Sequence, residues 1–495
     1  MVTSKFKTFI HQNIQIVMVK LVQIFSLLLF ISNLSAQELV SVTLKGSRTK
    51  SQIFSSLPSP DIRNGAKFYT VLYTSADAKG AKDTLSGLMV IPDNLSFVYP
   101  TLVYQHGTSD CKTCIPSRYG SSGGEEGQLG IIGAGLGYVS FLPDYVGMGN
   151  GRGFQTYVHA ATIQRATHDM ILAAQSWLAQ NNVRTNDQFF ITGYSQGGYA
   201  SMAYHKYREE NNLPVTAAAH LSGPYSLSTV MRELITGDKA YFFPAYLPNT
   251  ALGFQEVYGD VYGQLSDIFK PEFIPDIQAY YDGSITLTTL NGRLISKLTA
   301  QFGSSVAKNM LVPAYLDNIV NNQNARINQI LAENDIYKWA AVSPTRIFYC
   351  MGDDQVPFMN SVIARDTMVA LGSANLAATD VNPSANHGTC FNPAILATIF
   401  FFKTYQQILS SSETVLQEDM ILVTPNPAFD LVEISFPGEV RNISLLDMQG
   451  REILQKTGTF FEKAGMDISQ VLNGPYLIRL TTDRNQVIYK KVVKW

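Results

Sequence analysis

The stretch that decides the fold is Phe189 to Gly198, FFITGYSQGG. Its first three residues form an apolar run that predicts a buried strand, and residues 193–197 follow it directly as G-x-S-x-G. This pattern is typical of a sharp strand-to-helix turn that holds a serine hydroxyl exposed at the carboxyl edge of a sheet. A Cβ at either glycine would collide where the chain folds back. We therefore predict that Ser195 is a nucleophile; the alternative is a chance match to a common pattern.

The segments around this turn predict a mostly parallel sheet. Residues 198–210 carry small side chains on one face and polar ones on the other, so the start of this helix points its amides at Ser195. Residues 37–58 are polar and hard to place. Antiparallel strands are predicted at 67–73 and 85–92, buried strands at 100–108, 138–143, 217–221, 345–351 and 378–381, and helices at 157–180, 358–371 and 391–409. Continuous apolar strands separated by helices indicate the α/β class, with helices on both faces of the sheet.

A different kind of sequence lies between Tyr225 and Val342, where the alternation of strand and helix stops. This segment reads as helices that are rich in aromatic residues and broken by prolines. It follows the strand after the serine turn, where an insertion can cover a site at the carboxyl edge of the sheet. We expect residues 226–342 to form a helical cap, with an extra packing layer as the alternative.

Catalysis by Ser195 requires a base and a carboxylate that orients the base. In a chain with this serine turn the expected order is serine, acid, histidine. Of the seven histidines, only His387 lies beyond the strand that follows the predicted cap, so we predict that it is the base, in a loop over 383–389. Asp353 and Asp354 both follow that strand. Asp353 begins D-x-x-V-P and is the favoured acid, with Asp354 as the alternative.

The negative charge that develops on a substrate carbonyl needs two backbone N–H donors. Gln196 supplies one because it directly follows the nucleophile, and the loop after the strand that ends near His106 supplies the other. Thr108 is our choice in that loop. His106 itself is expected to brace the loop rather than react.

Composition excludes several function classes. The chain has 495 residues, a formal charge of −2 and no basic block, so we expect no nucleic-acid partner. Its glycine-rich runs fit no nucleotide-binding pattern, and no metal or other cofactor is predicted. Cys111 and Cys114 form a C-x-x-C pair, which favours a local disulfide over a redox site. A second bridge is predicted between Cys350 and Cys390.

Both ends of the chain carry signals for export or for a separate domain. Residues 18–36 combine a lysine, an apolar core and small residues before Gln37, which predicts a secretory signal peptide. A membrane anchor is the alternative, and it is disfavoured because the apolar run is short for a span. Short alternating strands are predicted at 431–436, 442–447, 476–481 and 487–493, which indicate a small β-sandwich. The predicted division is a signal peptide over 1–36, a catalytic domain over 37–410, a linker over 411–419 and a C-terminal domain over 420–495.

Five motifs make the catalytic part resemble the α/β-hydrolases. They are Gln105 to Thr108, Pro143 to Gly149, Gly193 to Gly197, Gly352 to Pro357 and Asn386 to Gly388. The resemblance implies an α/β-hydrolase fold with a triad of Ser195, Asp353 and His387. The second motif and the large insert resemble the secretory lipase branch, which hydrolyses carboxylic esters.

The C-terminal part resembles the sorting domain of the type IX secretion system of Bacteroidota. The motifs are Pro425 to Pro427, Leu446 to Gly450, Asp467 to Ser469, Asn473 to Tyr476 and Lys490 to Lys494. This resemblance implies recognition by the secretion machinery and export across the outer membrane, often with removal of the tail. A carbohydrate-binding or adhesive module is the alternative.

Together these features predict a secreted or cell-surface serine hydrolase that cleaves carboxylic esters of a small-molecule or lipid-like substrate, without a stable transmembrane anchor. A serine peptidase of the same fold is the alternative, and it would need acidic cap residues such as Glu256, Asp260 or Glu272 to bind a substrate ammonium group. A catalytically silent adhesin is disfavoured because all three triad residue types occur in order.

Overall fold

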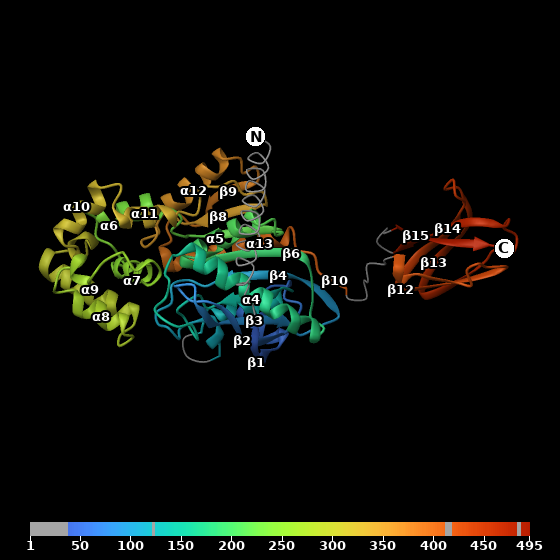
Figure 1. The fold of residues 1–495 in the computed structure, drawn as a ribbon, viewed down its shortest axis with the longest axis horizontal. Coiled ribbons are helices and arrows are strands. Elements are labelled where there is room, and N and C mark those ends of the chain that lie inside the picture. Colours follow the sequence, from blue (N-terminus) through green and yellow to red (C-terminus); the bar gives the residue numbers. More distant parts are fainter. Residues whose placement is uncertain (1–37, 121–123, 411–417, 483–486) are drawn as a thin grey trace, which may run out of the picture.

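The computed structural model describes residues 38–120, 124–410, 418–482 and 487–495. The predicted signal peptide over 1–36 and most of the predicted linker lie outside the described residues. Figure 1 shows a large body of sheet and helices, and a separate small β body formed by the C-terminal residues. Among the helices of the described part, none combines the length and hydropathy that a membrane span needs.

The large body is built on one mostly parallel sheet. Its strand order is β1-β2-β3-β5-β4-β6-β7-β8-β9, with β10 beside β4. The first three strands and the β3–β5 pair are antiparallel, whereas β5, β4, β6, β7, β8 and β9 run parallel to one another. The strands are β1 (Leu39–Arg48), β2 (Ala66–Ala76), β3 (Lys82–Pro92), β4 (Phe97–Gln105), β5 (Val139–Pro143), β6 (Arg184–Tyr194), β7 (Ala217–Leu221), β8 (Thr345–Tyr349), β9 (Leu376–Asp380) and β10 (Leu409–Ser410). The predicted α/β sheet is therefore confirmed.

Helices cover both faces of this sheet, as the apolar strands require. Side chains of α4 (Ala160–Gln180) and α5 (Gln196–Glu210) pack on one face with those of β3, β4 and β6. Side chains of α2 (Lys50–Ser56), α3 (Gly127–Gly135) and α13 (His387–Lys403) pack on the other face. Helix α12 (Met359–Ala370) contacts β8 and β9.

The first strand and the short helix after it were missed in residues 37–58. Strand β1 is the edge of the sheet, paired only with β2, and most of its residues are exposed or half-buried. An edge strand that buries little apolar surface lacks the alternation that identifies strands in sequence. Its polar composition therefore resembled a loop.

The segment between β7 and β8 forms helices that contribute to the same core as the sheet. They are α6 (Arg232–Thr236), α7 (Tyr246–Tyr258), α8 (Ile274–Tyr281), α9 (Leu287–Phe302), α10 (Pro313–Asn321) and α11 (Arg326–Glu333), and they gather at one side of the large body in Figure 1. Tyr199 of α5 and Tyr225 after β7 belong to the same buried cluster as Phe254 of α7 and Ile330 of α11. The inserted helices are thus packed directly onto the elements that carry Ser195.

His159 caps α4 beside these helices and makes folding sensitive to acid. Its Nδ1 accepts from the N–H of Thr162, and its ring lies edge-on to Tyr258. Burial, with a smaller contribution from the positive charge of Arg165, lowers the pKa of His159 from 6.5 to about 4. Because the folded state favours the neutral ring, this contribution to stability is fully present above pH 6.5 and is lost as the pH falls to about 4.

We predict that His159→Asn removes this acid sensitivity, because asparagine keeps a helix-capping acceptor without a titrating ring. The loss of unfolding free energy between neutral and acidic pH should be about 3 kcal/mol smaller in the variant than in the wild type. Urea unfolding at several pH values between 6.5 and 4 measures the difference. Parallel pH profiles for the two proteins would contradict the prediction.

The C-terminal residues form an antiparallel sheet around a core of their own. Its strands are β11 (Leu422–Thr424), β12 (Leu431–Leu446), β13 (Glu452–Asp467), β14 (Gly474–Thr482) and β15 (Val487–Lys494). Strand β12 pairs with β13 on one edge and with β11 and then β14 on the other. Buried side chains of these strands, such as Ile434, Leu445 and Ile478, form the core. The arrangement agrees with the predicted small β-sandwich.

Two details of that prediction were wrong. The strands expected at 431–436 and 442–447 are parts of the single strand β12, and no strand was expected at 452–467, where β13 lies. Register shifts interrupt the β12–β13 ladder, so the in-and-out alternation of both strands changes phase along their length. The pattern within a short window of sequence therefore predicts two strands, or no strand, for such a segment.

Candidate active site

The predicted site residues follow four parallel strands, β4, β6, β8 and β9, that end at one edge of the sheet. In the register of the sheet, Gln105 of β4 lies opposite Gly193 of β6, which lies opposite His220 of β7. Ser195 comes directly after β6, and the loop that holds Asp353 comes directly after β8. Parallel strands place these loops side by side although they are far apart in the chain.

The turn that holds Ser195 is strained and tightly packed. Ser195 has φ 60° and ψ −121°, and its N–H donates to the carbonyl of Leu221 at 2.9 Å. A Cβ on Gly193 would lie 2.3 Å from the carbonyl oxygen of Gly197, and a Cβ on Gly197 would lie 2.0 Å from that of Gln105. These contacts confirm that glycine is required at both positions. They keep Ser195 in a conformation that costs roughly 1–3 kcal/mol when it is unsupported.

The structure brings the predicted serine, histidine and acid into one hydrogen-bonded chain. His387 Nε2 lies 2.9 Å from Ser195 Oγ, and His387 Nδ1 lies 2.7 Å from Asp353 Oδ2. Only 8% of the His387 side chain and 1% of the Asp353 side chain are exposed. A buried carboxylate on one ring nitrogen leaves the other nitrogen free to accept a proton from the serine hydroxyl.

The two neighbouring aspartates contact His387 in different ways. Oδ1 of Asp353 accepts from the N–H groups of Gln355 and Val356, at 3.0 and 2.8 Å, which turns the other oxygen toward the imidazole. Asp354 is exposed, and its Oδ1 accepts from the backbone N–H of His387 at 3.1 Å. The Asp353 carboxylate thus faces the ring, whereas Asp354 holds the main chain beneath it.

His387 begins a helix instead of lying in a loop, which corrects our prediction for residues 383–389. Helix α13 begins at His387 because Asn386 caps it, with Asn386 Oδ1 accepting from the N–H of Thr389 at 2.9 Å. The predicted start of this helix was Phe391. Glycine at position 388 has a low helix propensity, which obscures the first turn in the sequence. The helical first turn gives His387 a fixed backbone.

Tyr194 is a further site residue that sequence reasoning missed. Its hydroxyl donates to the carbonyl of His387 at 2.5 Å, and the two ring centroids are 5.0 Å apart. Burial, with a smaller effect of the nearby Asp353 charge, raises the pKa of Tyr194, so the hydroxyl stays protonated. The sequence shows that Tyr194 lies next to Ser195 in the G-x-S-x-G turn, but it does not show the hydrogen bond to His387.

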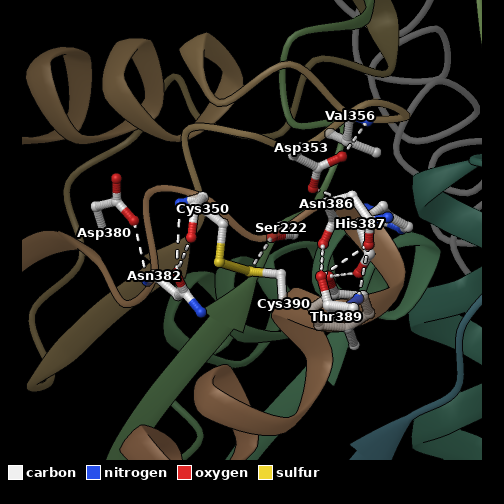
Figure 2. The surroundings of a disulfide bond; sticks show 12 residues. Ser222, Cys350, Asp353, Val356, Asp380, Asn382, Asn386, His387, Thr389 and Cys390 are labelled. Atoms are coloured by element: carbon white, nitrogen blue, oxygen red, sulfur yellow. Dashed lines mark hydrogen bonds and ion pairs between the residues drawn. A yellow bond between two sulfur atoms is a disulfide. The ribbon is translucent and has the colours of Figure 1, made fainter.

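A disulfide joins the segments that carry the acid and the base. Cys350 and Cys390 are bonded, and so are Cys111 and Cys114, which confirms both predicted bridges. Figure 2 shows the Cys350–Cys390 bond with Asp353 and His387 beside it. Each cysteine lies three residues from one of these side chains, so the bridge limits their relative movement.

We predict that Cys350→Ala together with Cys390→Ala lowers both stability and catalytic rate. The cysteines are 40 residues apart, and opening a loop of this size costs about 4 kcal/mol of unfolding free energy. The rate should fall because the distance between Asp353 and His387 is less restricted. Urea unfolding and kcat for ester hydrolysis measure the two effects.

The matched control is the pair Cys111→Ala and Cys114→Ala, which are three residues apart, and its expected cost is about 2 kcal/mol. Equal losses for the two pairs would argue against the larger bridge as a clamp on the site.

The two predicted backbone donors are the N–H groups of Thr108, in the loop after β4, and of Gln196, at the start of α5. Among the described residues, none accepts a hydrogen bond from the N–H of Thr108 or of Gln196. Glu126 accepts from the N–H of Gly107 with both carboxylate oxygens, at 3.1 and 2.9 Å. Asp110 accepts from the N–H of Thr288, at the start of α9, at 2.6 Å. The loop that carries Thr108 is therefore held from the core and from the inserted helices.

His106 is buried in this loop away from the serine. Its ring nitrogens lie 2.8 Å from the carbonyl oxygen of Gly107 and 3.3 Å from that of Asp144, and its ring stacks on Tyr145 at 4.1 Å. These contacts agree with the expected bracing role.

An apolar cavity lies between Ser195 and the inserted helices. Its walls include Tyr157, Leu227, Met231, Tyr246, Ile327 and Leu331. The inserted helices are also bonded to the acid loop, since Tyr241 donates to the carbonyl of Gln355 and Tyr246 to its side chain. The helices thus form the wall of the space that a substrate of Ser195 would enter.

Comparison with protein families gives two matches. Residues 131–212 match the prolyl oligopeptidase family, and residues 422–494 match the secretion system C-terminal sorting domain. A comparison with curated proteins gives no match.

Solved structures resemble the large body closely in fold. The esterase LipA from Xanthomonas oryzae, described as rice cell wall degrading, has a TM-score of 0.64 at 23% identity, covering 74% of this chain and 99% of that chain. A candidate hydrolase from Legionella pneumophila gives 0.66 at 22% identity, covering 74% and 98%. Lipase A from Candida antarctica gives 0.56 at 14% identity, covering 74% and 81%. The large body has the α/β-hydrolase fold.

The C-terminal body is a sorting domain of the type IX secretion system, which directs a protein out of the cell. The α/β-hydrolase described above is therefore secreted or displayed at the cell surface, in agreement with the sequence analysis. Export also agrees with the two disulfides, because such bonds persist in oxidising compartments.

Proposed function

We propose that this protein is an exported serine hydrolase that cleaves carboxylic esters, with Ser195, His387 and Asp353 as its catalytic residues. The observation that carries the proposal is the unbroken hydrogen-bonded chain from Ser195 Oγ through His387 to Asp353, at 2.9 and 2.7 Å. Ser195 also lines a cavity whose other walls are mostly apolar, as the acyl group of an ester requires.

The first half of the reaction forms an acyl-enzyme. Ser195 Oγ attacks the ester carbonyl carbon while His387 Nε2 takes the hydroxyl proton. Asp353 stabilises the imidazolium ring that results. The N–H groups of Gln196 and Thr108 stabilise the negative charge on the carbonyl oxygen.

The second half releases the acid and restores the enzyme. The acyl-enzyme is complete once His387 has given its proton to the leaving alcohol and the ester C–O bond has broken. His387 then takes a proton from a water molecule. The water oxygen attacks the acyl carbon, the bond to Ser195 Oγ breaks, and Oγ recovers a proton from His387.

A serine peptidase remains a second candidate because residues 131–212, which include Ser195, match the prolyl oligopeptidase family. The cap residues proposed for binding a substrate ammonium argue against it. Neither Glu256, Asp260 nor Glu272 lines the cavity that contains Ser195, and Asp260 is ion-paired with Arg326 at 2.9 Å.

A substrate panel on the full chain tests the proposal. We expect hydrolysis of p-nitrophenyl esters, negligible cleavage of aminoacyl p-nitroanilides, and labelling of Ser195 by a fluorophosphonate. Ser195→Ala is the control that should remove both hydrolysis and labelling. Efficient cleavage of the anilides would favour the peptidase, and an unlabelled Ser195 with no ester hydrolysis would refute the proposal.

A further inference from the structure

The cavity that contains Ser195 is lined by one charged side chain, Arg232, among the residues that the structure describes. Arg232 is the first residue of α6, and Met231 and Ile235 line the same cavity beside it. The other lining residues are apolar or uncharged, so this guanidinium is the one formal charge available to a molecule bound there.

Arg232 has no partner of its own within the described part of the chain. No hydrogen bond or ion pair of its side chain is found there, although the side chain is only partly exposed. Glu233 of α6 is exposed, and two other acidic residues of this region have partners of their own. Asp335 accepts from Ser228 and from Lys338 at 2.9 Å, and Asp238 pairs with Lys308 at 2.7 Å.

Because Arg232 is half-exposed and has no protein partner, its guanidinium is available to pair with an anionic group of a ligand in the cavity. The planar fork of arginine matches a carboxylate with two parallel hydrogen bonds. The apolar surface would hold a hydrocarbon chain between such a carboxylate and the ester at Ser195.

We propose that Arg232 binds a carboxylate at the far end of the acyl group, so that the preferred substrates are monoesters of dicarboxylic acids. This inference rests on the proposed ester hydrolysis. In that reaction water adds to the acyl carbon, the alcohol leaves with a proton, and the distal carboxylate stays unchanged on Arg232 until the diacid is released.

The experiment compares two series of p-nitrophenyl esters with the full chain. One series contains the monoesters of adipate, suberate and sebacate, and the other contains hexanoate, octanoate and decanoate, which match them in length. We expect one carboxylate-bearing ester to have the highest kcat/KM. Arg232→Met should lower that value by about 10- to 100-fold, mainly through KM, and should lower kcat/KM for the neutral series much less. Arg232→Lys should recover part of the loss, since it keeps the charge without the fork.

Glu233→Gln is the matched control, because Glu233 is the exposed neighbour on α6 and does not line the cavity. It changes the local charge by one unit and should leave the preference intact. A wild type that favours the neutral ester at every length, or an equal loss for both series in Arg232→Met, would overturn the inference. The proposed function fails separately, when neither series is hydrolysed and a neutral fluorophosphonate does not label Ser195.

Discussion

Replacing Ser195 with alanine is expected to lower kcat for p-nitrophenyl ester hydrolysis by about 10⁶-fold. The variant loses the oxygen that forms the acyl-enzyme, so that only the binding cavity and the backbone donors remain to assist water. His387→Ala should cost a similar factor, since without Nε2 the serine proton has no acceptor at 2.9 Å. Initial rates and fluorophosphonate labelling measure both effects.

The double variant tests whether the two residues act as a unit. Ser195→Ala combined with His387→Ala should be no slower than either single variant, because the same step is already lost. Ser201→Ala is the matched serine control on α5. Its hydroxyl lies 2.8 Å from the carbonyl oxygen of Gly198 and 2.7 Å from Nδ1 of His220, and it does not contact the proposed catalytic residues, so kcat should be retained. Additive losses in the double variant would show that Ser195 and His387 work independently.

Asp353→Asn should lower kcat by about 10⁴-fold, the effect expected when a carboxylate that orients a catalytic imidazole is lost. An amide in this place can donate to Nδ1, which then favours the ring form that carries its proton on Nε2, where it cannot accept from the serine. The N–H donors of Gln355 and Val356 keep the side chain in position, so the geometry should survive the change. The pH profile of kcat and the near-ultraviolet circular dichroism distinguish a lost charge from a lost fold.

Asp354→Asn is the matched comparison, and it should cost less than about 10-fold. The amide oxygen of asparagine can still accept from the N–H of His387, and Asp354 is exposed and does not contact the ring. The reverse outcome, a tolerated Asp353→Asn with a crippled Asp354→Asn, would move the acid role to Asp354.

The errors in predicting the fold come from segments whose burial is weak or changes along their length. Strand β1 is a half-exposed edge, so its residues carry little hydrophobic pattern. Strand β13 pairs with β12 through several register shifts, which break the alternation that identifies a strand. The central strands were found because burial on both faces requires apolar residues at nearly every position, as in β7.

The candidate site shows the same division between local and distant information. Ser195 was predictable because its turn imposes glycines within five residues. His387 and Asp353 were predictable from chain order and from the turn that begins at Asp353. The sequence did not predict that their side chains lie within hydrogen-bond distance of each other. The contact of Tyr194 with the His387 carbonyl joins residues that are 193 positions apart, so a local sequence pattern does not predict it.

The sequence by itself determined the parallel sheet, the serine turn, the order of the site residues and the C-terminal sorting domain. Each of these depends on contacts within a few residues or on a regular pattern of burial. Only the tertiary structure decided which aspartate oxygen faces the imidazole, how the disulfide restrains that pair, and that Arg232 enters an otherwise apolar cavity. Those features depend on side chains that meet across separate elements, where the packing of the whole chain sets positions to within an ångström or so.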